Sequence, residues 1–126
     1  MNNQTILEEF LKAISRNKKE EILAFFTEET IYHNIPMDPV RGLEGIWEAL
    51  APIHDICSEI DWVVHHIAEG PEGNVYTERN DRFAINGNWV EIPVMGIFEF
   101  SNGKITGWRD YFDLKQVTDQ MTEAMS

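Results

Sequence analysis

Basic residues are scarce in this chain, and that scarcity limits what it can bind. Lys and Arg together number 10 against 22 Asp and Glu, so the formal net charge is −12 at pH 7. Affinity for the phosphate backbone of nucleic acids rests largely on Lys and Arg, and binding to anionic membrane surfaces uses the same side chains. The composition therefore argues against a nucleic-acid partner and against a membrane-surface partner.

Long apolar runs and paired cysteines are also missing. No hydrophobic stretch approaches the roughly 20 residues that a membrane-spanning helix requires. The polar N-terminus, with its early glutamates, does not resemble a secretory signal peptide. Cys57 is the single cysteine of the sequence, so no disulfide can form within the chain. These absences together lead us to expect a cytosolic protein.

The sequence does contain enough apolar side chains for one folded domain. Hydrophobic residues make up 43% of its 126 residues. A chain of this length buries about two-thirds of the surface that it exposes when unfolded, which is enough for a substantial core. Because no repeat, linker or low-complexity tract divides the sequence, we expect a single domain over residues 1–126.

The first half of the chain has the periodicity of amphipathic helices. Apolar residues recur at helical spacing over residues 6–15, 22–26 and 43–53. Between the second and third of these patterns, residues 30–35 are typical of a short strand that ends at Pro36. The first two helices are expected to form a hairpin with one apolar side.

The second half of the chain alternates in the way that strands do. Strands are predicted near residues 59–68, 75–85, 89–100 and 104–112, and a short helix is predicted from Leu114. Because turns rich in Asn and Gly separate these strands, an antiparallel meander is expected. Helices first and strands afterwards indicate an α+β domain, with a curved, mixed or antiparallel sheet wrapped around helices.

One predicted strand has charged residues among apolar ones. Side chains alternate between the two faces of a strand, so Arg79 and Asp81 share a face with Val75 and Phe83. An exposed ion pair on the outer side of the sheet is the ordinary explanation of such a pattern. A charged site inside a pocket is the alternative, and the other strands must decide between the two.

Two further strands carry polar pairs at the same spacing. Tyr32 and Asn34 share one face of the first strand, and Trp108 and Asp110 share a face of the last strand with Phe112. The Asp110 carboxylate is therefore expected between two large aromatic residues. A carboxylate in such surroundings either takes a partner or holds its proton.

Arg79 is a candidate partner for both carboxylates, because its planar guanidinium has enough donors to serve two at once. If one carboxylate is more desolvated than the other, their pKa values separate. Our hypothesis is that Asp110 is the general acid and Asp81 the general base. Tyr32 and Asn34, a phenol and an amide, are suited to hold a water molecule. Such a set describes a hydrolase that forms no covalent intermediate.

Three segments resemble the active-site segments of the limonene-1,2-epoxide hydrolase family: Tyr32-x-Asn34, residues 77–81 and residues 105–113. The resemblance implies a cone-shaped α+β fold with a deep internal pocket, shared with nuclear transport factor 2-like and SnoaL-like proteins. It implies an enzyme that adds water to a small apolar epoxide and releases a vicinal diol. It also implies a homodimer through the open sheet face, and a reaction that requires no metal or organic cofactor.

The resemblance assigns residues to these roles. It matches the family's Asp-Arg-Asp triad to Asp81, Arg79 and Asp110, and its water-holding pair to Tyr32 and Asn34. Further residues fall on substrate-contacting positions of the family, and these are Trp108, Phe83, Ile92, Val94 and Phe112. At strand spacing, the same apolar residues would serve equally well as hydrophobic core. The chain is expected to lack the extra N-terminal segment that helps to close the pocket of the limonene enzyme.

Other classes of function remain as alternatives. The cone fold also hosts isomerases and cyclases that use an Asp base, of the SnoaL-like or ketosteroid-isomerase-like kind, and non-catalytic ligand-binding dimers. Neither alternative needs an arginine that bridges two carboxylates. The histidines do not suggest a metal site, because His65 and His66 point to opposite faces of a strand, while His33 and His54 have no partner at ligand spacing. All four are expected on the surface or partly buried.

Overall fold

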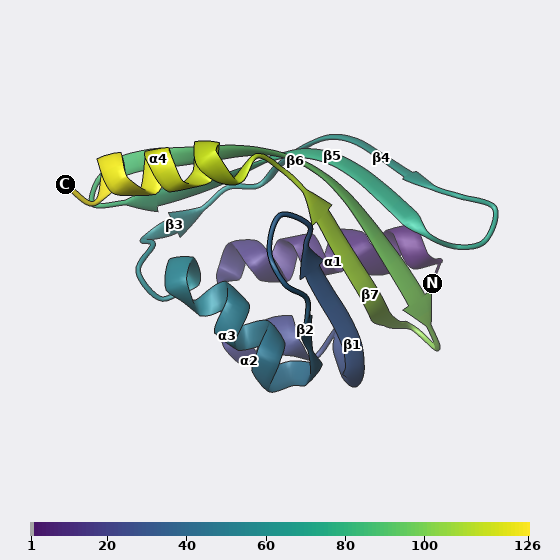
Figure 1. Ribbon diagram of the computed structural model, residues 1–126. Helices are drawn as coiled ribbons and strands as arrows, with labels where there is room; N and C mark the ends of the chain where they lie inside the picture. Colours follow the sequence, from purple (N-terminus) through teal and green to yellow (C-terminus); the bar gives the residue numbers. More distant parts are fainter. Residues whose placement is uncertain (1) are drawn as a thin grey trace.

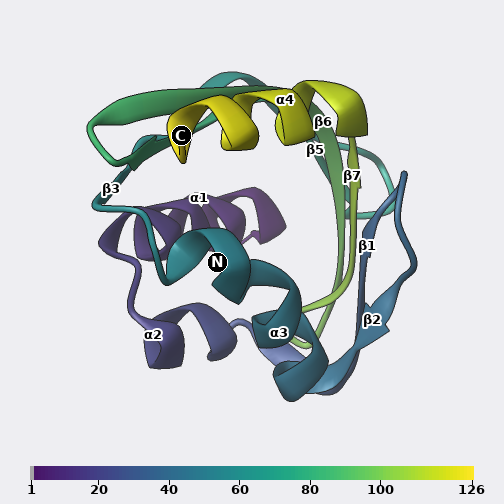
Figure 2. The ribbon, with the colours of Figure 1, turned by 60° about the vertical axis from the view of Figure 1, so that its left-hand side comes forward.

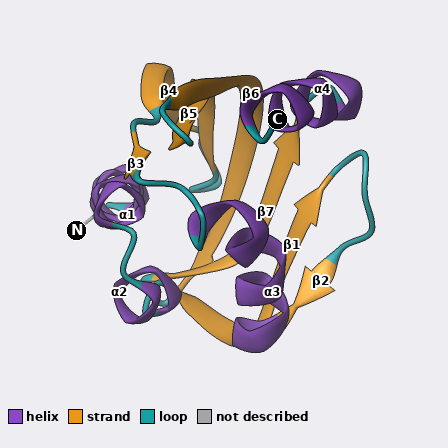
Figure 3. Cartoon of the chain, turned by 90° about the vertical axis from the view of Figure 1, so that its left-hand side faces the viewer, coloured by secondary structure: helices purple, strands orange, loops and turns teal. Residues whose placement is uncertain are grey.

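A bent sheet forms the outer wall of the molecule, and helices fill its concave side (Figure 1, Figure 3). The structure, a computed structural model, describes residues 2–126. Its elements follow one another as α1 (Asn3–Arg16), α2 (Lys19–Leu23), β1 (Phe26–Asn34), β2 (Val40–Arg41), α3 (Gly42–His54), β3 (Glu59–Ile60), β4 (Val63–Glu69), β5 (Val75–Ile85), β6 (Asn88–Ser101), β7 (Lys104–Tyr111) and α4 (Leu114–Ala124). The predicted α+β class is confirmed. Among the described residues, no helix is both long and apolar enough to span a bilayer.

The sheet joins the two halves of the chain. Its strand order is β2-β1-β7-β6-β5-β3, and β4 also pairs with β5. Strands β4 to β7 form the antiparallel meander that the sequence predicts. Strands β1 and β7 lie side by side (Figure 2) and run parallel (Figure 3), which places Tyr32 beside Trp108 and Asn34 beside Asp110. This long-range pairing brings the first polar pair next to the last one.

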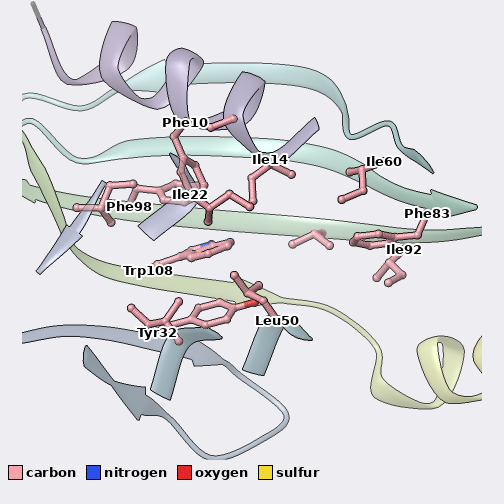
Figure 4. Close-up of a cluster of buried hydrophobic side chains, with 14 of the residues drawn as sticks. Phe10, Ile14, Ile22, Tyr32, Leu50, Ile60, Phe83, Ile92, Phe98 and Trp108 are labelled. Carbon is pink, nitrogen blue, oxygen red and sulfur yellow. The ribbon is translucent and has the colours of Figure 1, made fainter. Parts of the chain in front are cut away.

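Helix α1 closes the concave side because its apolar residues recur every three or four positions. The side chain of Asn2 caps its start by accepting from the backbone N–H of Thr5. Leu7, Phe10 and Ile14 on its inner face are fully buried. Figure 4 shows Phe10 reaching toward Phe98 and Trp108 of the sheet. Burial of each such side chain stabilises the fold by about 1.5–3 kcal/mol.

Two predicted elements differ from those observed. The second helix ends at Leu23, and Phe26 already belongs to β1, because the carbonyl of Phe25 accepts from the N–H of Ile105 and the chain joins the sheet there. The strand predicted over residues 59–68 is split into β3 and β4. Trp62 lies between the two pieces, on the inner side of the sheet, where it lines a cavity.

Candidate active site

Arg79 is fully buried on the inner face of β5, and its guanidinium joins the two carboxylates. Nε and Nη2 donate to the two oxygens of Asp81, each at 2.9 Å, and Nη2 also donates to Asp110 Oδ2 at 2.9 Å. Nη1 donates to Thr77 Oγ1 at 2.9 Å. The exposed fractions are 1% for Arg79, 5% for Asp81 and 3% for Asp110. The ion pair therefore lies inside the molecule, and the ordinary explanation of an exposed pair is wrong.

Gly96 makes this arrangement possible, and the sequence interpretation missed it. Strand β6 lies between β5 and β7, with Gly96 directly between Thr77 and Asp110. A Cβ at this position would lie 2.5 Å from Nη1 of Arg79 and 2.6 Å from Oδ1 of Asp110. The absence of a side chain lets the arginine cross β6 diagonally. An isolated glycine in the middle of a strand was the available signal.

Trp108 supports Asp110 from behind. Its indole Nε1 donates to Asp110 Oδ1 at 2.8 Å, and its ring stacks on Tyr32 with the centroids 4.1 Å apart. Trp108 is fully buried, and Figure 4 shows it in the core between Phe10 and Tyr32. It is not among the residues that line the cavity. The structure thus gives Trp108 a supporting position instead of the predicted substrate-contacting one.

The two remaining polar residues of the predicted set, Tyr32 and Asn34, line the cavity from β1, on the same inner side as Asp81 and Asp110. Burial raises the pKa of Tyr32 far above its ordinary value, and the negative charge of Asp110 adds to the rise. The phenol therefore keeps its proton at neutral pH and is able both to donate and to accept hydrogen bonds.

The pKa of Asp81 is higher than that of an ordinary surface carboxylate. Burial raises its pKa to about 6 from the ordinary 3.8; the positive charge of Arg79 opposes the rise and the negative charge of Asp110 adds to it. Burial alone would lower the pKa of Arg79, but the charges of Asp110 and Asp81 raise it, so Arg79 stays a cation. With both carboxylates ionised, the buried group has a net negative charge. A single proton on the carboxylate pair removes that charge, which favours a shared proton.

Apolar side chains form most of the cavity, whose volume is about 230 Å³. Phe83, Ile92, Val94 and Phe112 all line it, so these residues lie where the sequence predicts. Helices α3 and α4 complete the wall with Ala49, Leu50, Pro52, Ile53, His54, Leu114 and Val117. The volume is below the roughly 300–1,000 Å³ of pockets for drug-sized ligands. It suits a small and largely apolar molecule.

Among the cavity residues with polar side-chain atoms, two escaped the sequence interpretation, and these are His54 and Trp62. His54 is 4% exposed, so the expectation that it lies on the surface or only partly buried is wrong. It lies at the C-terminal end of α3, one helical turn after Leu50, on the face of the helix that packs inward. Its place in the inward stripe of the helix was the signal that could have found it.

No metal centre is evident in the part of the chain that the structure describes, where no group of three or more His, Cys, Asp or Glu side chains is arranged to hold an ion. His65 and His66 are exposed on β4, and His33 Nε2 lies 2.8 Å from the carbonyl oxygen of Met37. The arrangement in the cavity is instead suited to acid–base chemistry, because it holds two carboxyl groups, a cation and two neutral hydrogen-bonding groups.

The class of protein follows from the fold and the site together. The molecule is an enzyme domain with the cone-shaped α+β fold that nuclear transport factor 2-like and SnoaL-like proteins share, and two carboxyl groups bridged by an arginine lie at its pocket. A family model described as the limonene-1,2-epoxide hydrolase catalytic domain matches residues 1–123. This chain belongs to the limonene-1,2-epoxide hydrolase family.

Individual relatives agree with the family. Epoxide hydrolase EphG of Mycobacterium tuberculosis is 31% identical over 109 residues, which cover 86% of this chain and 71% of that protein. An LEH-like epoxide hydrolase structure from M. tuberculosis superposes with a TM-score of 0.80 at 26% identity, over 98% of this chain and 91% of that one. A protein described as a SnoaL-like polyketide cyclase, from Shewanella denitrificans, gives a TM-score of 0.83 at 16% identity, over 96% and 97% of the two chains. At that identity the likeness speaks for the fold alone.

Proposed function

We propose that this protein adds water to a small, largely apolar epoxide and releases a vicinal diol in one step, without a covalent intermediate. The observation that carries the proposal is the guanidinium of Arg79, which donates to both Asp81 and Asp110 beside an apolar cavity. The family match and the 31% identity to epoxide hydrolase EphG support the reaction class.

Water activation is assigned to three side chains. Tyr32, Asn34 and Asp81 line the same cavity, so a water molecule between them has both donors and acceptors available. Asp81 takes a proton from this water while the oxygen attacks a ring carbon. A folded-state pKa of about 6 makes Asp81 a stronger base than an ordinary carboxylate and still leaves it mostly ionised at neutral pH.

Asp110 supplies the proton that the opening ring requires. As the carbon–oxygen bond breaks, the carboxyl of Asp110 protonates the leaving oxygen, and the product keeps both oxygens as hydroxyl groups. Trp108 and Arg79 each occupy one oxygen of Asp110, and a second lone pair on each oxygen remains for a proton. At the end of the cycle Asp81 holds a proton and Asp110 has lost one, so a proton transfer between them restores the starting state. Each acid or base group contributes roughly 10²- to 10⁴-fold to the rate.

The arginine favours hydrolysis over the isomerase and cyclase chemistry that other cone-fold proteins perform. Isomerase chemistry with an Asp base does not require an arginine that bridges this base to a second carboxyl group. Here Asp81 receives two hydrogen bonds from Arg79, and Asp110 receives one. A paired base and acid on the two sides of one cation suit a reaction that takes and gives a proton in the same step.

A panel of epoxides, such as cyclohexene oxide, limonene oxide and styrene oxide, tests the proposal. The wild type is expected to form diols, and Asp81→Asn and Asp110→Asn are each expected to lose at least about 100-fold in rate. In a single turnover with oxygen-labelled water, the label should enter the diol at once. Label that enters the diol only after earlier cycles would show an ester intermediate and contradict the one-step mechanism.

We also propose that the chain forms a homodimer through the outer face of the sheet. Tyr76, Met95 and Tyr111 are about half exposed there, and Met95 lies directly beside Tyr111 in the pairing of β6 and β7. Large exposed apolar side chains grouped on one face are typical of protein interfaces. This face is opposite to the one that carries Arg79 and Asp81.

A further inference from the structure

His54 and Trp62 form a second polar site in the cavity, separate from the carboxylates. Both side chains line the cavity, and their ring centroids are 6.4 Å apart. Each ring also packs edge-on against Phe83, at 5.5 Å for His54 and 6.0 Å for Trp62. The mechanism proposed above uses neither residue.

Asn17 determines which nitrogen of His54 carries the proton. Its amide Nδ2 donates to the carbonyl oxygen of His54 at 2.8 Å, so its Oδ1 is the atom that faces the imidazole. That oxygen lies 3.0 Å from His54 Nδ1, and an amide oxygen only accepts hydrogen bonds. Nδ1 must therefore carry the proton. In a neutral ring, Nε2 is then an acceptor.

The imidazole is neutral because it is buried. Desolvation lowers the pKa of His54 to about 4 from the ordinary 6.5, so at neutral pH the ring has no charge. Nε2 makes no hydrogen bond to any described residue, and it is not among the polar atoms sealed away from solvent. His54 is 4% exposed and lines the cavity. We therefore infer that Nε2 faces the cavity.

Trp62 contributes the complementary group. Its indole Nε1 is the one enclosed side-chain nitrogen or oxygen in residues 2–126 without a hydrogen-bond partner. Buried donors are almost always paired, and an unpaired one calls for an explanation. The face of the same ring covers Arg79, with Cζ 4.9 Å from the ring centroid. Trp62 thus lies beside both the ionic group and His54, and its N–H has no partner among the described residues.

We propose that the non-reacting end of the substrate carries a hydroxyl group, which donates to Nε2 of His54 and accepts from Nε1 of Trp62. This inference rests on the proposed epoxide hydrolysis and names the substrate class as epoxy alcohols. A hydroxyl is the group that satisfies both atoms at once, whereas a carbonyl or ether oxygen would pair with Trp62 alone. Two hydrogen bonds of about 2.9 Å that meet at one oxygen place the two nitrogens at most about 5.8 Å apart, and the centroids of the two rings lie 6.4 Å apart.

The same geometry gives the spacing between the two functional groups of the substrate. Asp81 and Phe83 are neighbours on the inner face of β5, and such neighbours lie roughly 7 Å apart. The proposed base is at Asp81, and the hydroxyl site is beside Phe83. The hydroxyl is therefore expected about that distance from the reacting carbon, which corresponds to a chain of several carbons between them.

A matched pair of substrates tests the inference. One is a straight-chain terminal epoxide whose other end is a hydroxyl group, and the second is the same chain with a methyl group in place of that hydroxyl. The wild type is expected to favour the hydroxyl-ended epoxide by about 10- to 100-fold in kcat/KM, the combined effect of two neutral hydrogen bonds. Turnover of the methyl-ended epoxide tests the proposed hydrolysis alone, because this substrate has no hydroxyl group for the proposed site to bind.

Two variants remove the hydrogen-bonding atoms and keep the rings. In Trp62→Phe and in His54→Phe, the preference for the hydroxyl-ended epoxide should fall about tenfold or more, while kcat/KM for the methyl-ended epoxide changes only a few-fold. Trp47→Phe is the control, because Trp47 lies 6.2 Å from His54 by ring centroids but does not line the cavity. A general loss of folding would lower kcat/KM for both substrates by the same factor. The ratio of the two kcat/KM values therefore separates substrate recognition from stability.

The outcomes are distinct. Nitrogen NMR should find the His54 ring neutral with its proton on Nδ1, and a proton on Nε2 would overturn the proposal. Equal turnover of the two epoxides by the wild type would also overturn it, with the proposed hydrolysis intact. If neither epoxide reacts, the proposed function fails. In that case, calorimetry measures how tightly each of the two epoxides binds to the Asp81→Asn variant. The proposed hydroxyl site requires tighter binding of the hydroxyl-ended epoxide, and equal binding would overturn it.

Discussion

Arg79 and Arg82 lie on the same strand, β5, and each forms ion pairs with two carboxylates, but they occupy opposite faces of the sheet. Arg79 pairs with Asp81 and Asp110 and its side chain is 0% exposed. The side chain of Arg82 is 25% exposed, and it pairs with Asp61 and Glu91, which are about half exposed. The two arginines therefore have the same type of partners in different environments.

The difference in environment determines what each group can do. Water screens the outer pairs, so each contributes about 0–1 kcal/mol. On the inner face water is displaced, the net charge of the group matters, and the pKa of Asp81 rises to about 6. A carboxyl with a pKa of about 6 is able to exchange a proton near neutral pH, and the outer group serves as the control for the inner one.

Removing each arginine in turn should give the largest contrast. Arg79→Met leaves Asp81 and Asp110 buried without a cation, and we expect a loss of about 3–5 kcal/mol in unfolding free energy and no measurable diol formation. Arg82→Met should cost about 1 kcal/mol or less and retain activity. Urea unfolding and the epoxide assay measure both variants. Similar losses for the two variants would remove the distinction between the faces.

Arg79→Lys sharpens the first comparison at constant charge. A lysine ammonium is a point charge, whereas the guanidinium of Arg79 donates in fixed directions to Thr77, Asp81 and Asp110. We expect the lysine variant to fold better than the methionine variant and still to lose most of its activity. Full activity would show that charge alone, and not the fork geometry, is what the site needs.

The next contrast is between Asp81→Asn inside and Asp61→Asn outside. A carboxyl whose folded-state pKa is about 6 instead of 3.8 is destabilising when ionised, by roughly 3 kcal/mol at pH values above 6. Its favourable contribution is complete below the unfolded-state pKa and is lost as the pH rises through about 6. Asp81→Asn should therefore raise stability at pH 8, by up to about 3 kcal/mol, and have little effect near pH 4.

The activity of the wild type should rise with pH over the range in which the contribution of Asp81 to stability falls. Because Asp81 must be ionised to act as the base, kcat/KM of the wild type should fall about tenfold per pH unit below about 6. Asp81→Asn should abolish activity, and Asp61→Asn should leave the rate and its pH profile unchanged. Thermal unfolding at pH 4 and pH 8, with rates across that range, gives both readouts. A variant that is stabilised and inactive would be the signature of a functional carboxylate.

Gly96→Ala tests the space that the inner group requires. A Cβ at Gly96 would lie 2.5 Å from Nη1 of Arg79 and 2.6 Å from Oδ1 of Asp110, so the bridge would have to shift. Overpacking of this kind costs about 1–3 kcal/mol, and we expect the loss in kcat/KM to exceed what the loss in folded fraction explains. Gly45→Ala in α3 is the control, because its nearest contact is Val40 Cβ at 3.4 Å. Equal activity in both alanine variants would show that Gly96 is not needed for the bridge.

The sequence predicted local features of this site better than long-range ones. Alternation along β5 was enough to place Arg79 and Asp81 on one face, since that periodicity is a property of the strand itself. The parallel pairing of β1 with β7 joins distant parts of the chain, and the local residue pattern of neither strand predicts it. Here the resemblance to a family, and not periodicity, brought Tyr32 and Asn34 to Asp110.

The misinterpreted residues share a cause. Trp108 was expected to contact substrate, but its N–H is used by Asp110 and its ring is enclosed by Phe98 and Tyr32. His54 was expected at or near the surface, and the packing of α3 buries it. In both cases three-dimensional packing against other elements decides the outcome, and the spacing of residues along one element does not contain that information.

The smallest effect on catalysis is expected from the outer face. Met95→Glu places a charge beside Tyr111 on the surface proposed for the dimer, opposite to the face of Arg79. Because a buried, unpaired carboxylate is costly at an interface, we expect sedimentation velocity to show the variant as a monomer and the wild type as a dimer. Glu78→Gln is the matched control. Glu78 lies on β5 directly beside Met95 of β6, and removing its charge should leave the dimer intact. A variant that stays dimeric would place the interface elsewhere, and near-wild-type activity in a monomer would show that each subunit contains a complete inner site.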